Sequence, residues 1–205
     1  MSQYGAFEGR WAPITAETED ALPTYGNAVS LGELSRVTDA LNFASLTAEG
    51  DDRVVDSLDD FISGTVDIEY DPGVTNAALA AVFGTEVDED GELALSVDDH
   101  PPYGGYAFMR RMVRGTGADA EKYFQGIFYP KLKAVPQGKT HNGKKQSGTV
   151  LTGDKIHMSM EAAMNGQYMI ISPEIKTLKA AREWLEAKIP KAAAAAAAEP
   201  TEGTN

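Results

Sequence analysis

The hydrophobic pattern of the chain is strongest over residues 103–135, where two apolar runs flank a short glycine-rich segment at residues 115–119. Both runs are rich in aromatic, β-branched and methionine residues, and such runs on either side of a turn predict a long β-hairpin. Basic residues recur within the same two runs: Arg110, Arg111, Arg114, Lys122, Lys131 and Lys133. We therefore expect one face of the hairpin to lie on a core and the other to face water or another subunit.

Strict alternation over residues 62–70 predicts a second, half-buried strand. Its apolar side carries Ile62, Gly64, Val66, Ile68 and Tyr70. Weaker apolar runs predict a strand pair within residues 28–47 and further strands over residues 93–97, 150–160 and 168–171. These elements predict a mainly β fold.

Two helices complete the predicted elements. The first follows Asp71 and Pro72, which suit the N-cap and the first helical position, and it ends at Gly84. The second covers residues 173–189 and is ended by Pro190. Apolar residues recur at helical spacing along one face of this second helix: Leu178, Ala181, Leu185 and Ile189.

Three segments lack a clear period. Residues 1–27 predict an irregular N-terminal arm, whose aromatic residues indicate that it docks on a surface. Residues 48–61 predict a long acidic loop with apolar residues of its own, a pattern typical of contact loops. The chain therefore divides into the arm (residues 1–27), one domain (residues 28–190) and an alanine-rich, low-complexity tail (residues 191–205).

The composition of the 205 residues is that of a globular protein, with 42% hydrophobic residues and no cysteine. The absence of cysteine excludes disulfides, thiolate catalysis and Cys-ligated metals. No signal peptide is visible at the first residues, and no apolar run approaches the ~18 residues that span a bilayer. We therefore expect a soluble protein, without a membrane partner, made in a reducing cytoplasm.

Charge divides the chain into two unequal regions. Residues 49–99 contain sixteen acidic residues and one basic residue, a net charge of −15, whereas residues 110–155 contain ten basic and three acidic residues, a net charge of +7. Opposite charges on two regions suit head-to-tail contact between identical chains, although both regions also suit ordinary solvated faces. The total net charge of −13 argues against nonspecific binding to nucleic acid.

The sequence offers no complete catalytic or ligand motif. Gly138-Lys139-Thr140 ends like a phosphate-binding loop, but Lys133 stands where that motif requires glycine. The acidic residues 88–92 lack the spacing of a calcium-binding loop, and alternation through a strand explains Met158 and Met160 as core residues rather than copper ligands. We expect no enzyme activity, no cofactor and no metal site.

A resemblance to a known family rests on five ordered pieces of the chain. These are residues 23–26 (PTYG), 63–68 (SGTVDI), 98–106 (DDHPPYGGY), 123–131 (YFQGIFYPK) and 180–185 (AAREWL). In this order and spacing, over about residues 23–188, the chain resembles the major tail protein, or tail tube protein, of long-tailed non-contractile bacteriophages.

The resemblance implies an α+β fold that is mainly β, namely a β-sandwich or half-barrel with one flanking helix and a C-terminal helix. It also implies a structural virion protein that assembles into hexameric rings, stacked as a tail tube around a tape measure protein. Tail terminator and distal tail proteins close the ends, and genomic DNA passes through without sequence-specific binding. The implied location is the virion tail, and the host cytoplasm during assembly. The chain departs from some relatives because its C-terminus carries only the alanine-rich tail and no extra surface domain.

Two sets of residues are candidates for contacts between subunits. The candidate ring-stacking loop contains Asp51, Asp52, Arg53, Val54, Val55, Asp56, Leu58, Asp59 and Asp60. The candidate basic strand residues are Arg110, Arg111, Arg114, Lys131 and Lys133. Two other interpretations remain open: a tube protein of a bacterial secretion or contractile injection machine, and a soluble, acidic, β-rich enzyme or binding domain that would behave as a monomer.

Overall fold

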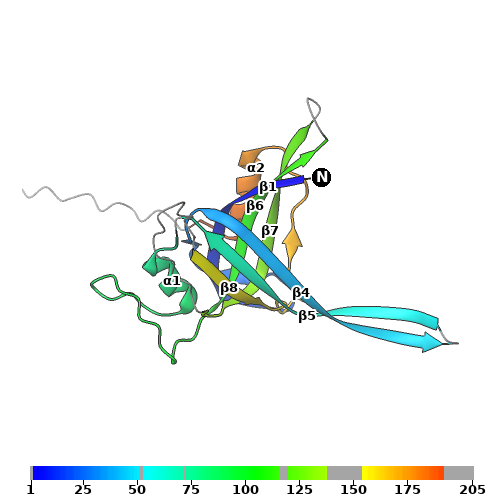
Figure 1. The fold of residues 1–205 in the computed structure, drawn as a ribbon, viewed down its shortest axis with the longest axis horizontal. Coiled ribbons are helices and arrows are strands. Elements are labelled where there is room, and N and C mark those ends of the chain that lie inside the picture. The colour runs from blue at the N-terminus through cyan, green and yellow to red at the C-terminus, as the bar shows by residue number, and fades with distance from the viewer. Residues whose placement is uncertain (1, 51–52, 72, 116–119, 138–153, 192–205) are drawn as a thin grey trace, which may run out of the picture.

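The computed structural model describes residues 2–50, 53–71, 73–115, 120–137 and 154–191. Its strands form one nine-stranded sheet with the order β2-β1-β6-β7-β8-β5-β4, in which β3 also pairs with β1 and β9 with β7 (Figure 1). The strands are β1 Ser2–Ala16, β2 Thr24–Tyr25, β3 Val29–Ser30, β4 Leu34–Gly50, β5 Arg53–Tyr70, β6 Tyr103–Arg114, β7 Glu121–Ala134, β8 Asp154–Met160 and β9 Ile170–Ile171. With the helices α1 Asn76–Phe83 and α2 Leu178–Lys188, this confirms the mainly β class.

The hairpin predicted over residues 103–135 is present as β6 and β7, which pair from Tyr103↔Lys133 to Arg114↔Glu121. Its middle is buried on both faces, because residues 104–109 and 126–130 are all buried. Tyr106 and Phe108 belong to one apolar cluster, and Met109 and Phe128 belong to another. The expectation of one solvent-facing side is therefore wrong for this part of the hairpin.

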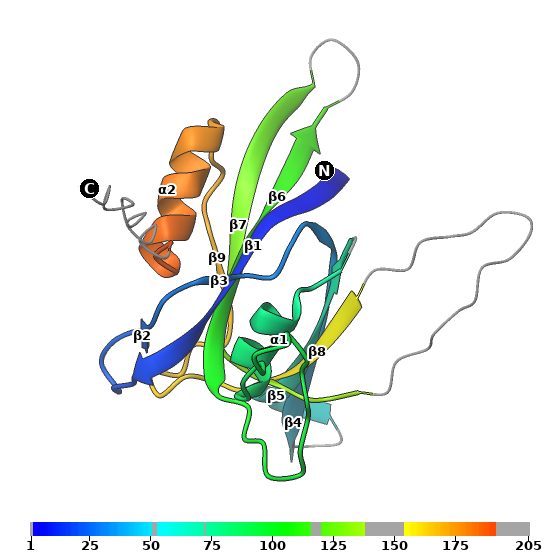
Figure 2. The same ribbon diagram turned by 90° about the vertical axis from the view of Figure 1, so that its left-hand side faces the viewer.

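Helix α1 covers the face of the hairpin that carries Tyr106 and Phe108. Figure 2 shows the two helices on opposite sides of β1, β6 and β7. Leu79 and Val82 of α1 pack into the same cluster as Tyr106 and Phe108. The helix begins later than predicted, because the Thr75 side chain accepts a hydrogen bond from the Ala78 N–H and so acts as the N-cap. Its predicted end is confirmed by Gly84, which adopts the left-handed conformation at the C-cap.

Helix α2 covers the second face of the hairpin. Ala181, Leu185 and Ile189 are fully buried and form one cluster with Met109 and Phe128, as the helical spacing predicted. Close approach depends on Gly126, because a Cβ atom at that position would lie 2.2 Å from Cζ3 of Trp184. Glycine is thus required where the helix crosses β7.

The N-terminal arm is not irregular over its first half. Ser2–Ala16 forms β1, which pairs with β6 from Ser2↔Val113 to Pro13↔Gly104. The register shifts twice, between Gln3 and Ala6 and between Phe7 and Arg10. Each shift breaks the period of two by which a strand is recognised in a sequence. The strand expected at residues 93–97 is also absent, and only an isolated bridge between Val87 and Leu93 lies there.

The predicted acidic loop at residues 48–61 is mostly strand. Strand β4 continues to Gly50, β5 begins at Arg53, and the two pair up to Gly50↔Arg53. The strand pair expected within residues 28–47 is likewise replaced, because β4 pairs with β5. The abundance of aspartate in residues 51–60 hid this strand from the sequence pattern.

Candidate assembly surfaces

The β4–β5 hairpin extends beyond the rest of the sheet (Figure 1). Strand β8 pairs with β5 only from Gly64↔Met160 to Tyr70↔Asp154. Beyond the register pair Phe43↔Phe61, the hairpin consists of two strands, and no third strand among the described residues pairs with it. We call residues 44–60 the projecting hairpin.

Three aromatic rings hold the base of the projecting hairpin. The Phe61 ring stacks on Tyr168, with centroids 4.1 Å apart and an interplanar angle of 8°. Phe43 meets both rings edge-on, at 5.8 Å from Phe61 and 6.1 Å from Tyr168. Phe43 nevertheless remains 42% exposed, and nearby Ile62 is 57% exposed. The predicted burial of Ile62 is wrong, although Gly64, Val66, Ile68 and Tyr70 on the same face are buried as predicted.

The projecting hairpin carries most of the candidate ring-stacking residues. Arg53, Val54, Val55, Asp56, Leu58, Asp59 and Asp60 lie on β5, whereas Asp51 and Asp52 lie outside the described residues. Residues 44–60 contain six acidic residues and one arginine, a net charge of −5. Asp59 and Asp60 are exposed, and no ion pair between described residues involves either of them. Their role in ring stacking remains a prediction.

The candidate basic residues do not form one patch. Arg110, Arg111 and Arg114 lie toward the turn between β6 and β7, and Lys131 and Lys133 lie near the opposite end of the hairpin. Most of them have partners in their own chain. Arg110 donates two hydrogen bonds to Gln125 Oε1, at 3.1 and 2.6 Å, and Arg114 forms an ion pair with Glu174. The Arg111 guanidinium lies 4.6 Å from the centroid of the Phe7 ring.

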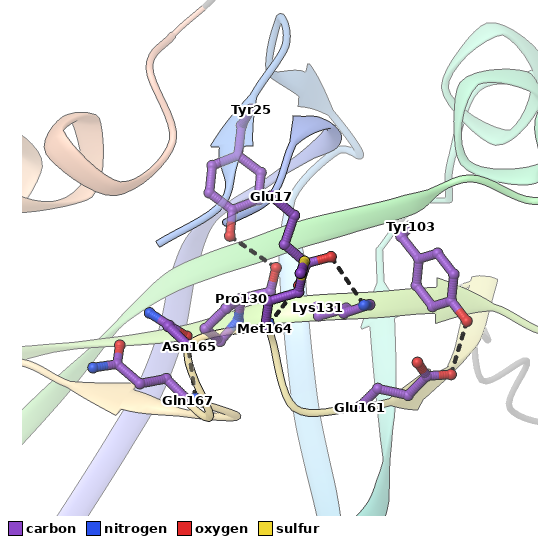
Figure 3. Close-up of polar contacts among 9 residues, drawn as sticks. All are labelled: Glu17, Tyr25, Tyr103, Pro130, Lys131, Glu161, Met164, Asn165 and Gln167. Carbon is purple, nitrogen blue, oxygen red and sulfur yellow. Dashed lines mark hydrogen bonds and ion pairs between the residues drawn. The ribbon is translucent and has the colours of Figure 1, made fainter. Parts of the chain in front are cut away.

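Lys131 belongs to a network that joins three distant segments (Figure 3). Its Nζ lies 3.0 Å from Glu17 Oε2, and Glu17 Oε1 accepts a hydrogen bond from the Met164 N–H at 2.7 Å. The Tyr25 hydroxyl donates to the Pro130 carbonyl at 2.8 Å, and burial raises the pKa of Tyr25. Both side chains of the Lys131–Glu17 pair are mostly buried, so Lys131 makes its charged contact within its own chain.

The network continues through Tyr103 to Glu161, the residue that follows β8. Lys131 and Lys133 lie 4.9 and 5.4 Å from the centroid of the Tyr103 ring. The Tyr103 hydroxyl donates to Glu161 Oε1 at 2.9 Å, and this hydrogen bond to a carboxylate raises the pKa of Tyr103. Sequence reasoning missed this network, since its partners are far apart in the chain and no local spacing marks them.

A second polar group lies where β5 pairs with β8. Asp67 Oδ1 lies 2.6 Å from His157 Nδ1, and Asp67 Oδ2 lies 2.7 Å from Lys155 Nζ. Burial alone would raise the pKa of Asp67, but the hydrogen bonds from Lys155 and His157 outweigh burial and hold that pKa below its ordinary value. Met158 and Met160 are fully buried, which confirms them as core residues.

The outer edge of β4 pairs with no strand in the described part of the chain. This strand ends the sheet order, and within the described residues β5 is its only strand partner. Its 17 residues make it one of the longest strands in the sheet. A long edge strand offers a row of backbone donors and acceptors to another chain.

Other kinds of site are not apparent in the described part of the chain. No group of three or more His, Cys, Asp or Glu side chains there is arranged to hold a metal ion. No helix among these residues is both long and apolar enough to cross a bilayer. Comparison with known proteins finds no protein-family model and no curated protein that matches the sequence.

Proposed function

We propose that this chain is the subunit of a tube, namely the major tail protein of a long-tailed, non-contractile bacteriophage. In this proposal it is a structural, non-enzymatic virion protein. Copies assemble into hexameric rings, and the rings stack into the conduit through which DNA enters the host. The five sequence pieces given above supply the resemblance, and the surfaces of the monomer support it.

The projecting hairpin is the observation that carries the proposal. Two strands without a third are marginally stable in water, so an isolated ribbon of this length requires contacts from elsewhere. Its base is anchored by Phe43, Phe61 and Tyr168, which sets its direction relative to the sheet. In a stack of rings, a neighbouring subunit supplies the missing contacts.

The open edge of β4 suits ring closure. Soluble monomers usually protect a long edge strand with charges, prolines, bulges or a covering segment. The β4 sequence contains no proline and three charged residues, Arg36, Asp39 and Glu49, and its register against β5 shifts at three places along its 17 residues. Pairing of this edge with the next subunit around a ring removes the unpaired backbone groups.

The charge of the chain suits a conduit for DNA. At a net charge of −13, a stack of many copies repels phosphates, which favours passage of DNA over binding. The same proposal places the tape measure protein in the lumen during assembly. Tail terminator and distal tail proteins then cap the two ends of the tube.

Negative-stain electron microscopy of the purified protein tests the proposal, with a variant that lacks the projecting hairpin as the comparison. Because Ala44 and Asp60 are register partners, replacing residues 45–59 by Asn-Gly closes a two-residue turn without shifting the remaining pairs. We expect rings or tubes from the wild type, and a folded monomer from the variant, with unchanged circular dichroism. Unimpaired tubes from the shortened variant would contradict the role of the projecting hairpin. Monodisperse small particles of the wild type at every concentration and salt would contradict the tube itself.

A further inference from the structure

A groove of about 790 Å³ lies at the start of β4, at the end opposite the projecting hairpin. It is lined by residues of β1, β3, the start of β4 and α2 and of the segments next to them, among them Phe7, Arg10, Val29, Leu34, Arg182 and Glu186. The lining combines apolar side chains with three basic ones (Arg10, Arg182 and Lys191) and three acidic ones (Glu8, Glu33 and Glu186).

Arg10 directly follows a bulge in β1. The register of β1 against β6 shifts between Phe7 and Arg10, and Glu8 within that shift adopts a positive φ of 54°. A positive φ is uncommon for a residue with a side chain, and bulges redirect the side chains that follow them. Glu8 is held by Arg182, whose Nε donates to Glu8 Oε1 at 2.7 Å.

Arg10 is the group in the groove whose hydrogen bonds are incomplete. Its side chain is only 16% exposed. Nη2 lies 3.7 Å from Glu186 Oε1, an ion-pair separation that is too long for a hydrogen bond. Nη1 is buried and has no hydrogen-bond partner among the described residues. Arg182, by contrast, has its carboxylate partner within the chain.

A buried guanidinium nitrogen without an acceptor is unusual, because such groups are nearly always paired in folded proteins. The group that is missing is an acceptor, and arginine is best matched by a carboxylate, whose two oxygens fit its planar fork. Arg10 lines the groove and is partly exposed, so its guanidinium is the group there that suits an acidic side chain from outside the monomer.

The structure also indicates where such an acidic side chain comes from. Leu34 lines the groove and is the first residue of β4, whereas Ala44, the register partner of Asp60, lies at the base of the projecting hairpin. At ~3.3 Å per residue, Leu34 and Ala44 are separated by roughly 30 Å along β4. The acidic side chains Asp59 and Asp60 are therefore far from the groove of their own copy, and a second copy placed head to tail is the source that we infer.

We propose that the groove is a carboxylate-binding site in which Arg10 receives an acidic side chain from the projecting hairpin of a second copy. The described acids at the base of the β5 side of that hairpin, Asp59 and Asp60, are exposed and without ion pairs among the described residues. This inference rests on the proposed role of the projecting hairpin in assembly and adds the site that receives it.

Cross-linking between two populations tests the contact directly, since the chain contains no cysteine. One population carries Asp60→Cys and the other carries Glu186→Cys at the groove, and the two are mixed with a short bismaleimide. We expect a covalent dimer from this mixture. As the matched control on the same helix, Lys179→Cys is more exposed than Glu186 but does not line the groove, so it should give at least tenfold less dimer. Equal yields from both mixtures would overturn the proposal.

Charge exchange tests the chemistry of the same contact. Replacing Arg10 by Gln, or by Met if the Gln variant folds poorly, should raise the protein concentration needed for assembly about tenfold or more, because it removes one partner of a desolvated pair. Arg10→Glu should fail to assemble alone and should recover when Asp59→Arg and Asp60→Arg are present in the same chain. Without recovery, or with normal assembly of Arg10→Gln, the groove does not bind these carboxylates.

The outcomes separate this inference from the tube proposal. Normal tubes from the Arg10→Gln variant leave the tube intact and overturn the groove. A specific cross-link in a preparation that forms no tubes supports the groove and counts against the tube. The C-terminal residues 192–205 are the other candidate occupant, since Lys191 also lines the groove. If deletion of those residues reproduces the defect of Arg10→Gln, the tail is the occupant and the proposal is overturned.

Discussion

Two long antiparallel hairpins of this protein are in opposite situations. The β6–β7 hairpin lies within the sheet, with β1 on one side, β8 and β9 on the other, and an apolar cluster on each face. In the described part of the chain, the outer edge of the β4–β5 hairpin has no strand partner, and its outer part, residues 44–60, has no third strand. The described residues thus contact the β6–β7 hairpin on both edges and both faces, and they leave the outer part of β4–β5 without a neighbouring strand.

The difference bears on which hairpin we propose as the contact between subunits. Basic residues on β6 and β7 suggested from the sequence that this hairpin carries contacts between subunits. In the monomer, however, Lys131 is paired with Glu17 and Arg114 with Glu174. The acidic side chains Asp59 and Asp60 have no such partners among the described residues. The comparison therefore favours the β4–β5 hairpin as the assembly element, and the basic set remains a prediction.

The largest expected difference in the free energy of unfolding is between two phenylalanine substitutions, one on each hairpin. Phe128 on β7 is fully buried, whereas Phe43 on β4 is 42% exposed. We expect Phe128→Ala to lower the free energy of unfolding by about 3–5 kcal/mol, because it leaves a cavity between the sheet and α2. Phe43→Ala should lower it by about 1 kcal/mol, the loss of its edge-on aromatic contacts. Urea denaturation of both monomers measures the two values, and equal losses would remove the distinction between the hairpins.

A substitution at Gly126 tests whether the close packing of α2 on the second face of β6–β7 requires glycine at this position. A Cβ atom there would overlap the Trp184 ring at 2.2 Å, so Gly126→Ala should destabilise the monomer by about 1–3 kcal/mol through overpacking. The control is the double variant with Trp184→Ala, which removes the clash. The Gly126 substitution should then cost clearly less than it does beside the intact Trp184. A cost that does not depend on Trp184 would mean that α2 is not the source of the constraint.

The strand β5 shows how far its sequence predicts its surroundings. Alternation correctly placed Gly64, Val66, Ile68 and Tyr70 on the buried face. It failed at Ile62, because the register of β5 against β4 shifts there: Asn42 pairs with Ser63 and Phe43 with Phe61, so Ile62 is the extra residue of a bulge and is 57% exposed. The alternation of a strand is a local property of its sequence, whereas a bulge depends on its register with the partner strand.

The candidate sites were less predictable than the fold. The charges of residues 51–60 and of β6–β7 are visible in the sequence, but their partners are not. Lys131 pairs with Glu17, 114 positions away, and Arg114 pairs with Glu174, 60 positions away. The bulge before Arg10 was also hidden, since its positive φ falls on Glu8 rather than on a glycine. Long-range pairing and irregular backbone leave no local spacing to recognise.

The smallest expected effect is a difference in stability between substitutions of acidic residues in the two halves of β5, Asp67 in one half and Asp59 and Asp60 in the other. The pKa of Asp67 is lowered in the folded state by His157 and Lys155, so its contribution to stability is fully present above its unfolded pKa of about 3.9 and is lost as the pH falls through the lower folded value. Asp67→Asn should therefore cost about 1 kcal/mol at pH 6 and progressively less below pH 4. Asp59→Asn and Asp60→Asn should change the monomer by less than about 0.5 kcal/mol at either pH, since both side chains are exposed. Urea denaturation of the monomers at pH 6 and pH 3 measures these differences, and a larger cost for Asp59→Asn than for Asp67→Asn would mean that the projecting hairpin is held by its own chain.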